Sequence, residues 1–401
     1  MMTPRDCDNA LLTQVRNAAQ TVLSMSETFT FSYLEKCLPA EALQKVQKVI
    51  LTGCGDSYCI GVAARPCFES EGAYPGFQAE ALRNIEAARY YRTYAGWGEK
   101  KAEDHLICAV SITGSPVRPR EALARINQLG GISVAFTDNE NSLFAREAKY
   151  AVRINVPQDH YKPGVTDEEC PGMTSYIAGC YAVMMFGLYM CVCKGLMTKQ
   201  QAEEQRQAAI EYARAFTPEL IDDLEEKAFR FAEKLQADGF DCMDFIAEDQ
   251  EFATAFFASP KMVESFGAVT THDDAEDWCH INYFNRNPAR IATFLMANPS
   301  SPSFSRDQET ATCAVAIKRP LAIICEDTAD GLPEQAWTFK MPTPKYRWIN
   351  ALLQHIPMDF IAAYLGIFRR QMPVGISSEL HERDAACARF KKSEQVFVEE
   401  L

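Results

Sequence analysis

The chain has 401 residues, of which 47% are hydrophobic and 23% charged, a balance typical of a globular protein large enough for two domains. A formal net charge of −14 and the lack of a basic stripe argue against nucleic acid as a partner. The most apolar run, near residues 181–193, is shorter than a membrane span requires, and the first residues lack the apolar segment of a secretory signal. We therefore expect a cytoplasmic protein without a membrane partner.

The 15 cysteines are scattered, and several stand in apolar runs such as Ile107-Cys108-Ala109-Val110. Without a secretory signal, such cysteines are expected to be reduced core residues. Neither Cys191 with Cys193 nor Cys54 with Cys59 has the spacing and nearby histidines of a zinc site. We expect no metal and no cofactor.

The first half of the chain alternates predicted strands and helices. After an N-terminal helical segment over residues 1–45, a strand over 46–52 ends in Gly53-Cys54-Gly55-Asp56-Ser57 before a helix over 58–70. The alternation continues with a strand over 106–110, the turn Ser111-Ile112-Thr113-Gly114-Ser115, a helix over 119–129 and a strand over 132–136. This order indicates a parallel sheet in a first domain over residues 46–196.

The second half begins with a charge-rich helical bridge over residues 197–240, which only Pro218 interrupts. A second α/β domain is expected over 241–372, and a tail over 373–401. Its predicted elements are strands over 241–247, 291–297 and 321–326, a helix over 252–266 and a long helix over 347–368. The expected fold class is α/β with two lobes, each a parallel sheet flanked by helices.

The two turns that follow strands resemble those of the sugar isomerase (SIS) domain family, in which the corresponding loops are Gly-Cys-Gly-Thr-Ser and Ser-Gln-Ser-Gly-Glu-Thr. Tandem members include the isomerase half of glucosamine-fructose-6-phosphate aminotransferase and the fructosamine-6-phosphate deglycases. Lys261-Met262-Val263-Glu264 is similar to the Lys-Leu-Lys-Glu of the aminotransferase. His280 follows Glu264 by 16 residues, as the family's active-site histidine follows its glutamate. The resemblance covers residues 46–366 and implies a two-lobed SIS fold.

The sequence departs from that pattern at several places. Ile281-Asn282-Tyr283 follows His280 where the aminotransferase has Gly-Pro, and Ala247-Glu248-Asp249 replaces the glycine-rich turn expected after a second-lobe strand. No glutaminase domain is present, so ammonia transfer from glutamine is not expected. In the aminotransferase a lysine near the C-terminus forms an imine with the sugar, and the resemblance leaves open whether Lys391 or Lys392 enters the site in the same way.

Phosphate binding needs several donors that converge on one point, and a strand–turn–helix unit supplies them through amides at the helix start and nearby hydroxyls. The alternative for each such serine or threonine is a helix N-cap. Two such loops in succession, with a third hydroxyl-bearing turn matching the family, favour phosphate binding. The candidate residues are Gly55, Asp56, Ser57, Ser111, Thr113, Gly114, Ser115, Thr174 and Ser175.

The catalytic candidates are Glu264, His280 and Lys261. Glu264 is the candidate base that moves a proton beside the sugar carbonyl or imine, and its alternative is a solvated helix glutamate. His280 is the candidate for opening the sugar ring, with His272 as its rival and a core histidine as its alternative. Lys261, one helical turn before Glu264, would tune the carboxylate or bind a hydroxyl, and its alternative is a surface lysine.

The resemblance therefore implies an enzyme that acts at C1 and C2 of a sugar or amino-sugar 6-phosphate. A fructosamine-6-phosphate deglycase is the expected type, and a deaminase or an aldose-ketose isomerase stays open. The alternative is a non-catalytic sugar-phosphate sensor or regulatory SIS protein. The family also implies a homodimer or higher homo-oligomer. The sequence does not name the sugar or the leaving amine.

Overall fold

The computed structural model of the chain describes residues 3–69, 78–91, 102–158 and 171–369. The chain divides into two compact units. Of the described residues, 24–69, 78–91, 102–157 and 175–207 form the first lobe, and 3–23, 158, 171–174 and 208–369 form the second lobe. Each lobe has its own sheet, and each is described by itself below.

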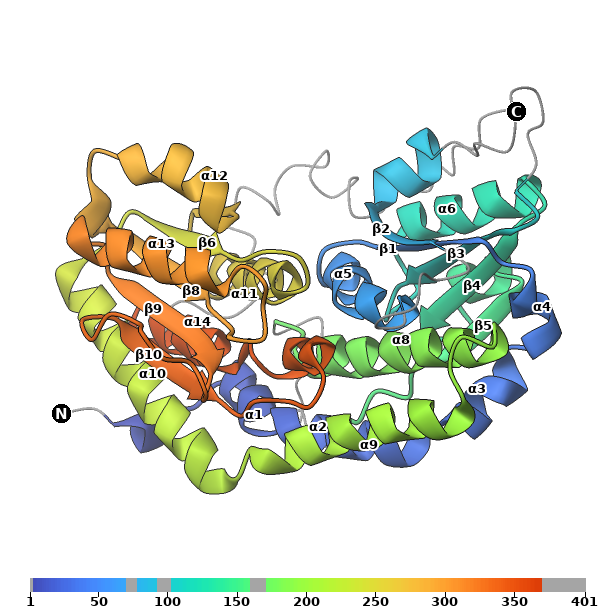
Figure 1. Cartoon of the computed structure of the whole chain (residues 1–401), viewed down its shortest axis with the longest axis horizontal. Coiled ribbons are helices and arrows are strands. Elements are labelled where there is room, and N and C mark those ends of the chain that lie inside the picture. Colours follow the sequence, from blue (N-terminus) through green and yellow to red (C-terminus); the bar gives the residue numbers. More distant parts are fainter. Residues whose placement is uncertain (1–2, 70–77, 92–101, 159–170, 370–401) are drawn as a thin grey trace, which may run out of the picture. The chain divides into compact units, whose positions relative to one another are not determined.

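The sheet of the first lobe has five parallel strands in the order β2-β1-β3-β4-β5 (Figure 1). Its strands are β1 (Lys48–Gly53), β2 (Gln78–Arg83), β3 (His105–Val110), β4 (Ile132–Thr137) and β5 (Tyr150–Arg153). The neighbouring strands β3 and β4 are buried along their whole length, as expected of parallel strands covered on both faces. The chain leaves β1 for β2 on one side and later returns to β3 on the other, so the topological switch point lies between β1 and β3.

The second lobe repeats this arrangement, with five parallel strands in the order β10-β9-β8-β6-β7 (Figure 1). Its strands are β6 (Cys242–Ile246), β7 (Thr270–Asp273), β8 (Ile291–Met296), β9 (Leu321–Glu326) and β10 (Trp337–Met341). The switch point lies between β6 and β8. By order, β6, β8 and β9 therefore correspond to β1, β3 and β4 of the first lobe.

Helices connect and cover the strands, so the expected fold class, α/β with two lobes of parallel sheet and helix, is confirmed. The helices that carry the arguments below are α5 (Asp56–Phe68), α6 (Val117–Gln128), α8 (Thr174–Cys193), α10 (Pro218–Asp238), α11 (Glu251–Phe266), α12 (Ala275–His280), α13 (Phe304–Ala316) and α14 (Ile356–Phe368). The remaining α-helices are α1 (Ala10–Arg16), α2 (Ala18–Thr28), α3 (Phe31–Cys37), α4 (Ala40–Gln44), α7 (Leu143–Glu147) and α9 (Lys199–Ala215). The charge-rich segment that predicted a helical bridge forms α9 and α10.

Two apolar helices correct the expectation that no segment reaches membrane-spanning length. Residues 174–193 and 347–368 are both long and apolar enough to cross a membrane by length and composition. In each, however, 89% of the most apolar window is buried inside the protein. Both segments therefore belong to the core, and burial on all sides explains why they lack a polar face.

The long helix expected over residues 347–368 is interrupted. A 3₁₀ helix covers Arg347–Leu352, and α14 begins only at Ile356. Pro357 stands in the first turn of α14 and has no amide hydrogen to donate to the carbonyl of Leu353, so the helical ladder has to restart there. The restart places His355 at the N-cap of α14, where its side chain is buried.

The close approach of β1 to the start of α5 gives a prediction about Gly53. A Cβ atom at Gly53 would lie 2.5 Å from the backbone carbon of Ser57, so Gly53→Ala must displace the first turn of α5. We expect a loss of about 1 to 3 kcal/mol of unfolding free energy, measured by thermal or denaturant unfolding.

The control is Gly195→Ala. A Cβ at Gly195 meets no atom within 4 Å, and only its φ of +71° opposes alanine. This variant should lose about 1 kcal/mol through backbone strain alone. A Gly53→Ala protein with the same unfolding free energy as the parent would contradict the close approach of β1 to α5.

Candidate functional site

The first candidate loop joins β1 to α5. Gly55 is the N-cap of α5 with a φ of +55°, and Asp56 and Ser57 form the first helical turn. The Ser57 amide donates to the Cys54 carbonyl at 3.0 Å, which closes the turn directly behind the strand. The loop therefore presents the N-terminus of a helix at the carboxyl edge of the sheet, next to the switch point.

The second candidate loop, from Ser111 to Ser115, follows β3 on the other side of the switch point. The Gly114 amide donates to the Ser111 carbonyl at 3.1 Å, and the Ser115 amide donates to the Thr113 hydroxyl at 3.2 Å. Gly114 has a φ of +66°, and a Cβ there would lie 2.3 Å from the hydroxyl oxygen of Ser142. Only glycine fits this turn, so the loop is held in one shape.

Thr174 and Ser175 begin the buried helix α8. The Thr174 amide donates to the Gln14 side chain at 2.9 Å. Within the first lobe, the charge of Asp56 contributes to the raised pKa of Tyr176, although burial and the neighbouring cysteines Cys180 and Cys59 contribute more. The first turn of α8 in that lobe therefore lies near the first turn of α5.

The hydroxyls of these segments share one property. In the described part of the chain, no hydrogen bond to another residue is donated by the hydroxyls of Ser57, Ser111, Ser115, Thr174 or Ser175. Ser111, Thr174 and Ser175 are also buried. Buried hydroxyls normally have partners, so the hydroxyls of the first lobe, those of Ser57, Ser111, Ser115 and Ser175, are suited to an acceptor supplied by a ligand.

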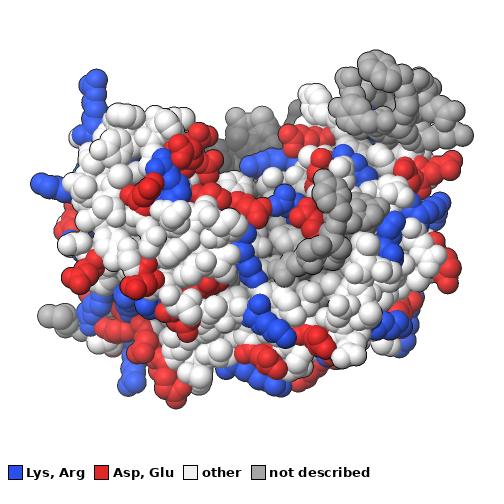
Figure 2. All heavy atoms as spheres, viewed as in Figure 1, with Lys and Arg blue, Asp and Glu red and all other residues white. Residues whose placement is uncertain are grey.

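Two arginines lie near the first-lobe loops, although the chain has a formal net charge of −14. Burial raises the pKa of Cys54. A hydrogen bond from Asn84 and, to a smaller extent, the charge of Arg118 oppose this rise, so the Arg118 guanidinium lies near the first loop. The Arg83 guanidinium, at the end of β2, lies 4.8 Å from the ring centroid of Tyr58. Elsewhere on the face drawn in Figure 2, basic and acidic side chains are interspersed.

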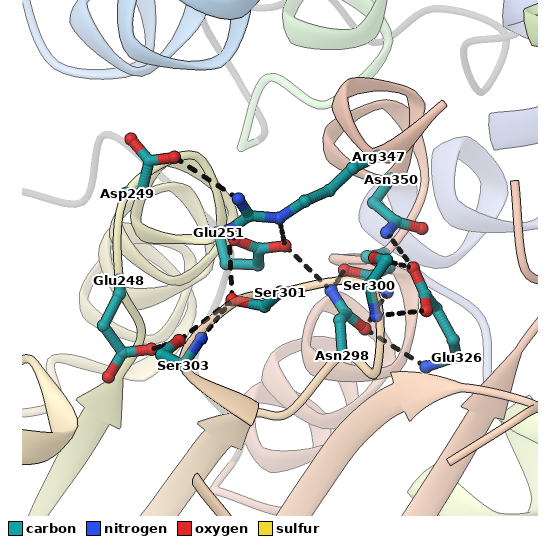
Figure 3. Close-up of polar contacts among 11 residues, drawn as sticks. Glu248, Asp249, Glu251, Asn298, Ser300, Ser301, Ser303, Glu326, Arg347 and Asn350 are labelled. Atoms are coloured by element: carbon teal, nitrogen blue, oxygen red, sulfur yellow. Dashed lines mark hydrogen bonds and ion pairs between the residues drawn. The ribbon is translucent and has the colours of Figure 1, made fainter. Parts of the chain in front are cut away.

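The corresponding loop of the second lobe is filled by the chain itself (Figure 3). Glu326, the last residue of β9, accepts hydrogen bonds from the Ser300 hydroxyl at 2.5 Å, the Ser300 amide at 3.1 Å and the Asn350 side chain at 2.7 Å. The residue at this position in the first lobe is Thr137, the last residue of β4, whose hydroxyl donates to the Ile112 carbonyl at 3.1 Å. The carboxylate of Glu326 therefore accepts from the second-lobe loop, whereas no described carboxylate accepts from the loop over residues 111–115.

Glu251 extends this internal network at the start of α11. Its carboxylate accepts from the Arg347 Nε at 3.0 Å and from the Asn298 side chain at 3.1 Å (Figure 3). Arg347 also donates to the Ser301 hydroxyl at 3.2 Å and pairs with Asp249 at 3.5 Å. These residues satisfy one another, so the second-lobe loops do not form a phosphate site.

Glu248 and Asp307 form a pair of carboxyl groups in the same region. Glu248 accepts from the Ala275 amide at 2.6 Å and the Ser303 hydroxyl at 3.2 Å. Asp307 in the first turns of α13 is 1% exposed, and neither of its oxygens has a donor among the described residues. Burial, then the charge of Glu248, raises the pKa of Asp307 well above its usual range, so this carboxyl is protonated at neutral pH.

Lys261 and Glu264 are brought together by the structure. The Lys261 ammonium donates to Oε2 of Glu264 at 2.7 Å. The lysine side chain is completely buried, which excludes the surface-lysine alternative, whereas the Glu264 side chain is 35% exposed. No described residue donates to Oε1 of Glu264, so one carboxylate oxygen stays available for proton transfer.

His280 is not joined to Glu264 by any hydrogen bond or ion pair within the described ranges. Its side chain is 68% exposed and pairs with Glu276 at 2.9 Å, so it is not a core histidine. Helix α12, which carries His280, is nevertheless held in place, because the Trp278 indole donates a hydrogen bond to the buried Asp244 at 2.5 Å. His272 packs between aromatic rings, 4.8 Å from the Phe256 centroid, as a structural histidine does.

Two features of the second lobe were missed by sequence reasoning. The buried pair His355 and Asp359 and the Glu248–Asp307 pair both join residues with no recognised motif. A histidine and an aspartate four residues apart near Pro357 could have signalled the first. Lys391 and Lys392 lie outside the described residues, and no group of ligand side chains in the described ranges could hold a metal ion.

The raised pKa of Asp307 makes stability depend on pH. The folded protein keeps this proton at a pH where the unfolded chain has lost it, so folding stability is full below the usual aspartate pKa and falls as pH rises toward the folded value. Asp307→Asn removes that dependence, and the variant should gain about 1 to 3 kcal/mol over the parent at pH 8.

Thermal unfolding of parent and variant between acidic and alkaline pH measures this difference. Asp223→Asn, on the exposed side of α10, controls for the general loss of a negative charge. A parent and an Asp307→Asn variant whose melting temperatures keep a constant difference at every pH would contradict the protonated state.

Comparison with known proteins gives structural matches only. No family model matches the sequence, and no curated protein matches it. The chain is similar to the C-terminal domain of glucosamine-fructose-6-phosphate aminotransferase from Francisella tularensis, with a TM-score of 0.75 and 13% identity over 93% of this chain and 100% of the other.

Two further solved structures are similar over most of their length. The glucosamine-6-phosphate deaminase from Thermotoga maritima has a TM-score of 0.64 and 15% identity, with 92% of this chain and 98% of that chain covered. The tagatose-6-phosphate ketose/aldose isomerase from Escherichia coli has a TM-score of 0.65 and 14% identity, with 90% and 92% covered. At these identities the likeness concerns the fold, and the chain has the two-lobed SIS fold that its loops predicted.

Proposed function

We propose that this chain is a phosphosugar enzyme of the fructosamine-6-phosphate deglycase type. The observation that carries the proposal is the contrast between the two lobes. The first-lobe loops have hydroxyls without internal partners, whereas Glu326 occupies the corresponding second-lobe loop. A phosphate on the first-lobe loops would accept hydrogen bonds from the hydroxyls of Ser57, Ser111 and Ser115. The carboxylate of Glu326 accepts hydrogen bonds from Ser300 in the same way.

The proposed reaction runs backward along an Amadori rearrangement. Glu264, through Oε1, takes a proton from C1 of the ring-opened ketoamine, and an enaminol forms. Return of the proton to C2 gives an imine at C1, which water cleaves to glucose 6-phosphate and a free amine. Lys261 holds Oε2 of Glu264 and keeps the carboxylate oriented. His280, exposed on α12, is the proposed acid that opens the sugar ring.

The solved structures that share this fold include a deaminase and an isomerase of sugar phosphates by their printed names, which supports a phosphorylated sugar as the ligand. The charged turn Ala247-Glu248-Asp249 and the segment after His280 replace the glycines of the aminotransferase pattern. We take these polar replacements as support for a substrate with an attached amine.

The phosphate assignment is tested by binding. Ser111→Ala combined with Thr113→Ala should weaken binding of a hexose 6-phosphate by about 1 to 3 kcal/mol and leave the unphosphorylated hexose unchanged. Ser300→Ala is the matched control, because its hydroxyl serves Glu326 in the corresponding loop and its loss should not change phosphosugar affinity. Calorimetry that shows equal weakening in the control, or none in the first-lobe variant, contradicts the assignment.

The reaction is tested by its products. Purified protein is incubated separately with Amadori 6-phosphates such as the lysine adduct, glucosamine 6-phosphate and fructose 6-phosphate, and amine, ammonia and aldose are measured by mass spectrometry. We expect amine from the Amadori compounds, and a decrease of at least about a hundredfold in Glu264→Gln with little change in binding.

Each other outcome points to a different function. Ammonia from glucosamine 6-phosphate alone identifies a deaminase, and aldose from fructose 6-phosphate alone identifies an isomerase. Binding without any product identifies a sensor. A Glu264→Gln protein that keeps more than roughly a tenth of the parent rate shows that another residue is the base.

A further inference from the structure

Two cysteines of the second lobe lie on neighbouring helices. Cys279 is on α12 and Cys313 is on α13, and these two helices pack against each other (Figure 1). Both residues carry free thiols and are half-buried, whereas Cys108 and Cys325 are completely buried in the two sheets. A half-buried thiol is open to a reagent from solvent, and a completely buried thiol is not. Cys279 and Cys313 are therefore both available for thiol chemistry.

Two contacts show how α12 and α13 are aligned. Glu276 pairs with Arg306 at 2.8 Å, and one turn further along both helices the sulfur of Cys279 lies 3.6 Å from the hydroxyl oxygen of Thr310. Between packed helices, a side chain of one helix inserts among residues i, i+3, i+4 and i+7 of the other. For Cys279 this space begins at Arg306 and ends at Cys313. The alignment therefore places the two cysteines next to each other.

The electrostatics of the thiols agree with this alignment. Burial, and then the ionised thiol of Cys279, raises the pKa of Cys313, and the charge of Arg306 opposes this rise. The Arg306 guanidinium in turn has a raised pKa, to which Glu309 contributes most and Cys279 also contributes. Such influences weaken with distance, so Cys279 lies close to both residues. Both cysteines also pack against the same apolar cluster of the second lobe.

Thiols that lie side by side have two common uses, metal binding and disulfide formation. No group of ligand side chains in the described ranges could hold a metal ion, so the contacts of Cys279 and Cys313 do not favour the first use. A purely apolar role in the core does not fit their partial exposure to solvent. Half-buried neighbouring thiols are instead typical of cysteines that form a disulfide reversibly.

We propose that Cys279 and Cys313 form a reversible thiol–disulfide pair that joins α12 to α13, with a low-molecular-weight disulfide as the oxidant. This site goes beyond the proposed function and does not depend on it. Cys279 directly precedes His280, so the bond also restrains the helix that carries the proposed acid.

The exchange proceeds in two steps. One thiol of the pair loses its proton to solvent, and its thiolate attacks the oxidant, which forms a mixed disulfide and releases one oxidant thiolate. The other thiol then loses its proton and attacks the protein sulfur of the mixed disulfide, which forms the bond between Cys279 and Cys313 and releases the second oxidant thiolate. The two released thiolates take up the two protons. The protein thiols thus lose two electrons, and one oxidant disulfide is reduced to two thiols.

The test is to oxidise the full chain and identify the bond. Purified protein is incubated at about pH 8 with glutathione disulfide, its remaining thiols are blocked with iodoacetamide, and proteolytic peptides are analysed by mass spectrometry. We expect the peptide pair that joins Cys279 to Cys313 to be the main cross-linked product, and to disappear after treatment with dithiothreitol. Two thiols that are both blocked by iodoacetamide, or that each carry glutathione without being joined, would overturn the proposal.

Single substitutions test the partnership. Cys279→Ser should lose the cross-link and leave glutathione attached to Cys313, because the second thiol needed to release it is absent. Cys313→Ser should leave glutathione on Cys279 in the same way. Cys242→Ser, a half-buried cysteine of β6 in the same lobe, is the matched control and should leave the yield of the cross-link unchanged. A cross-link that is lost equally in the control refutes a specific pair.

Two further measurements connect the bond to the folded structure. Oxidation in denaturing urea should give much less of the Cys279–Cys313 product, because only the packed helices hold these thiols together. In the folded protein, the amides of α12 should exchange with deuterium more slowly after oxidation, and this slowing should be absent in Cys313→Ser. Equal yields in folded and unfolded protein, or unchanged exchange in α12, would overturn the proposal. None of these measurements involves a sugar phosphate, so they keep their meaning if the proposed function fails.

Discussion

The polar groups at the carboxyl edge of a buried parallel sheet need an acceptor, and this requirement separates the two lobes. In the second lobe Glu326 supplies it from the end of β9, and the serine loop closes around that carboxylate. In the first lobe the equivalent strand ends in Thr137, which donates to a backbone carbonyl instead. Among the described residues, no carboxylate accepts a hydrogen bond from the first-lobe loop over residues 111–115. We therefore propose that the first-lobe hydroxyls serve a phosphorylated ligand, whereas in the second lobe the carboxylate of Glu326 takes that place.

Much of the fold followed from the sequence, because alternating apolar strands and helices with glycine turns leave few arrangements of a parallel sheet. The exceptions have local causes. Pro357 interrupts the ladder of the long helix expected over residues 347–368, and a helical pattern does not show where the ladder restarts. Residues 174–193 form a helix of membrane-spanning length that is buried inside the protein, and composition alone cannot separate these two situations.

The candidate site was predictable to a smaller extent. The spacing of Lys261 and Glu264 places both on one side of α11, and the structure joins them. The helix that packs against α11 behind this pair is α14, almost a hundred residues further along the chain, and no local pattern connects the two helices. The contrast between the lobes was equally hidden, since it depends on whether a β-strand ends in Glu326 or in Thr137. Contacts between residues far apart in the sequence decide both features.

The cluster between α11 and α14 links the chemistry of the second lobe to its core. A completely buried ammonium is costly unless carboxylates and hydrogen bonds surround it, so Lys261 tolerates burial only with Glu264 and the groups behind it. His355 and Asp359 form a buried pair of their own at the start of α14, which packs against α11. Because α11 carries both Lys261 and Glu264, a substitution that shifts α14 is expected to disturb the Lys261–Glu264 pair as well as the stability of the second lobe.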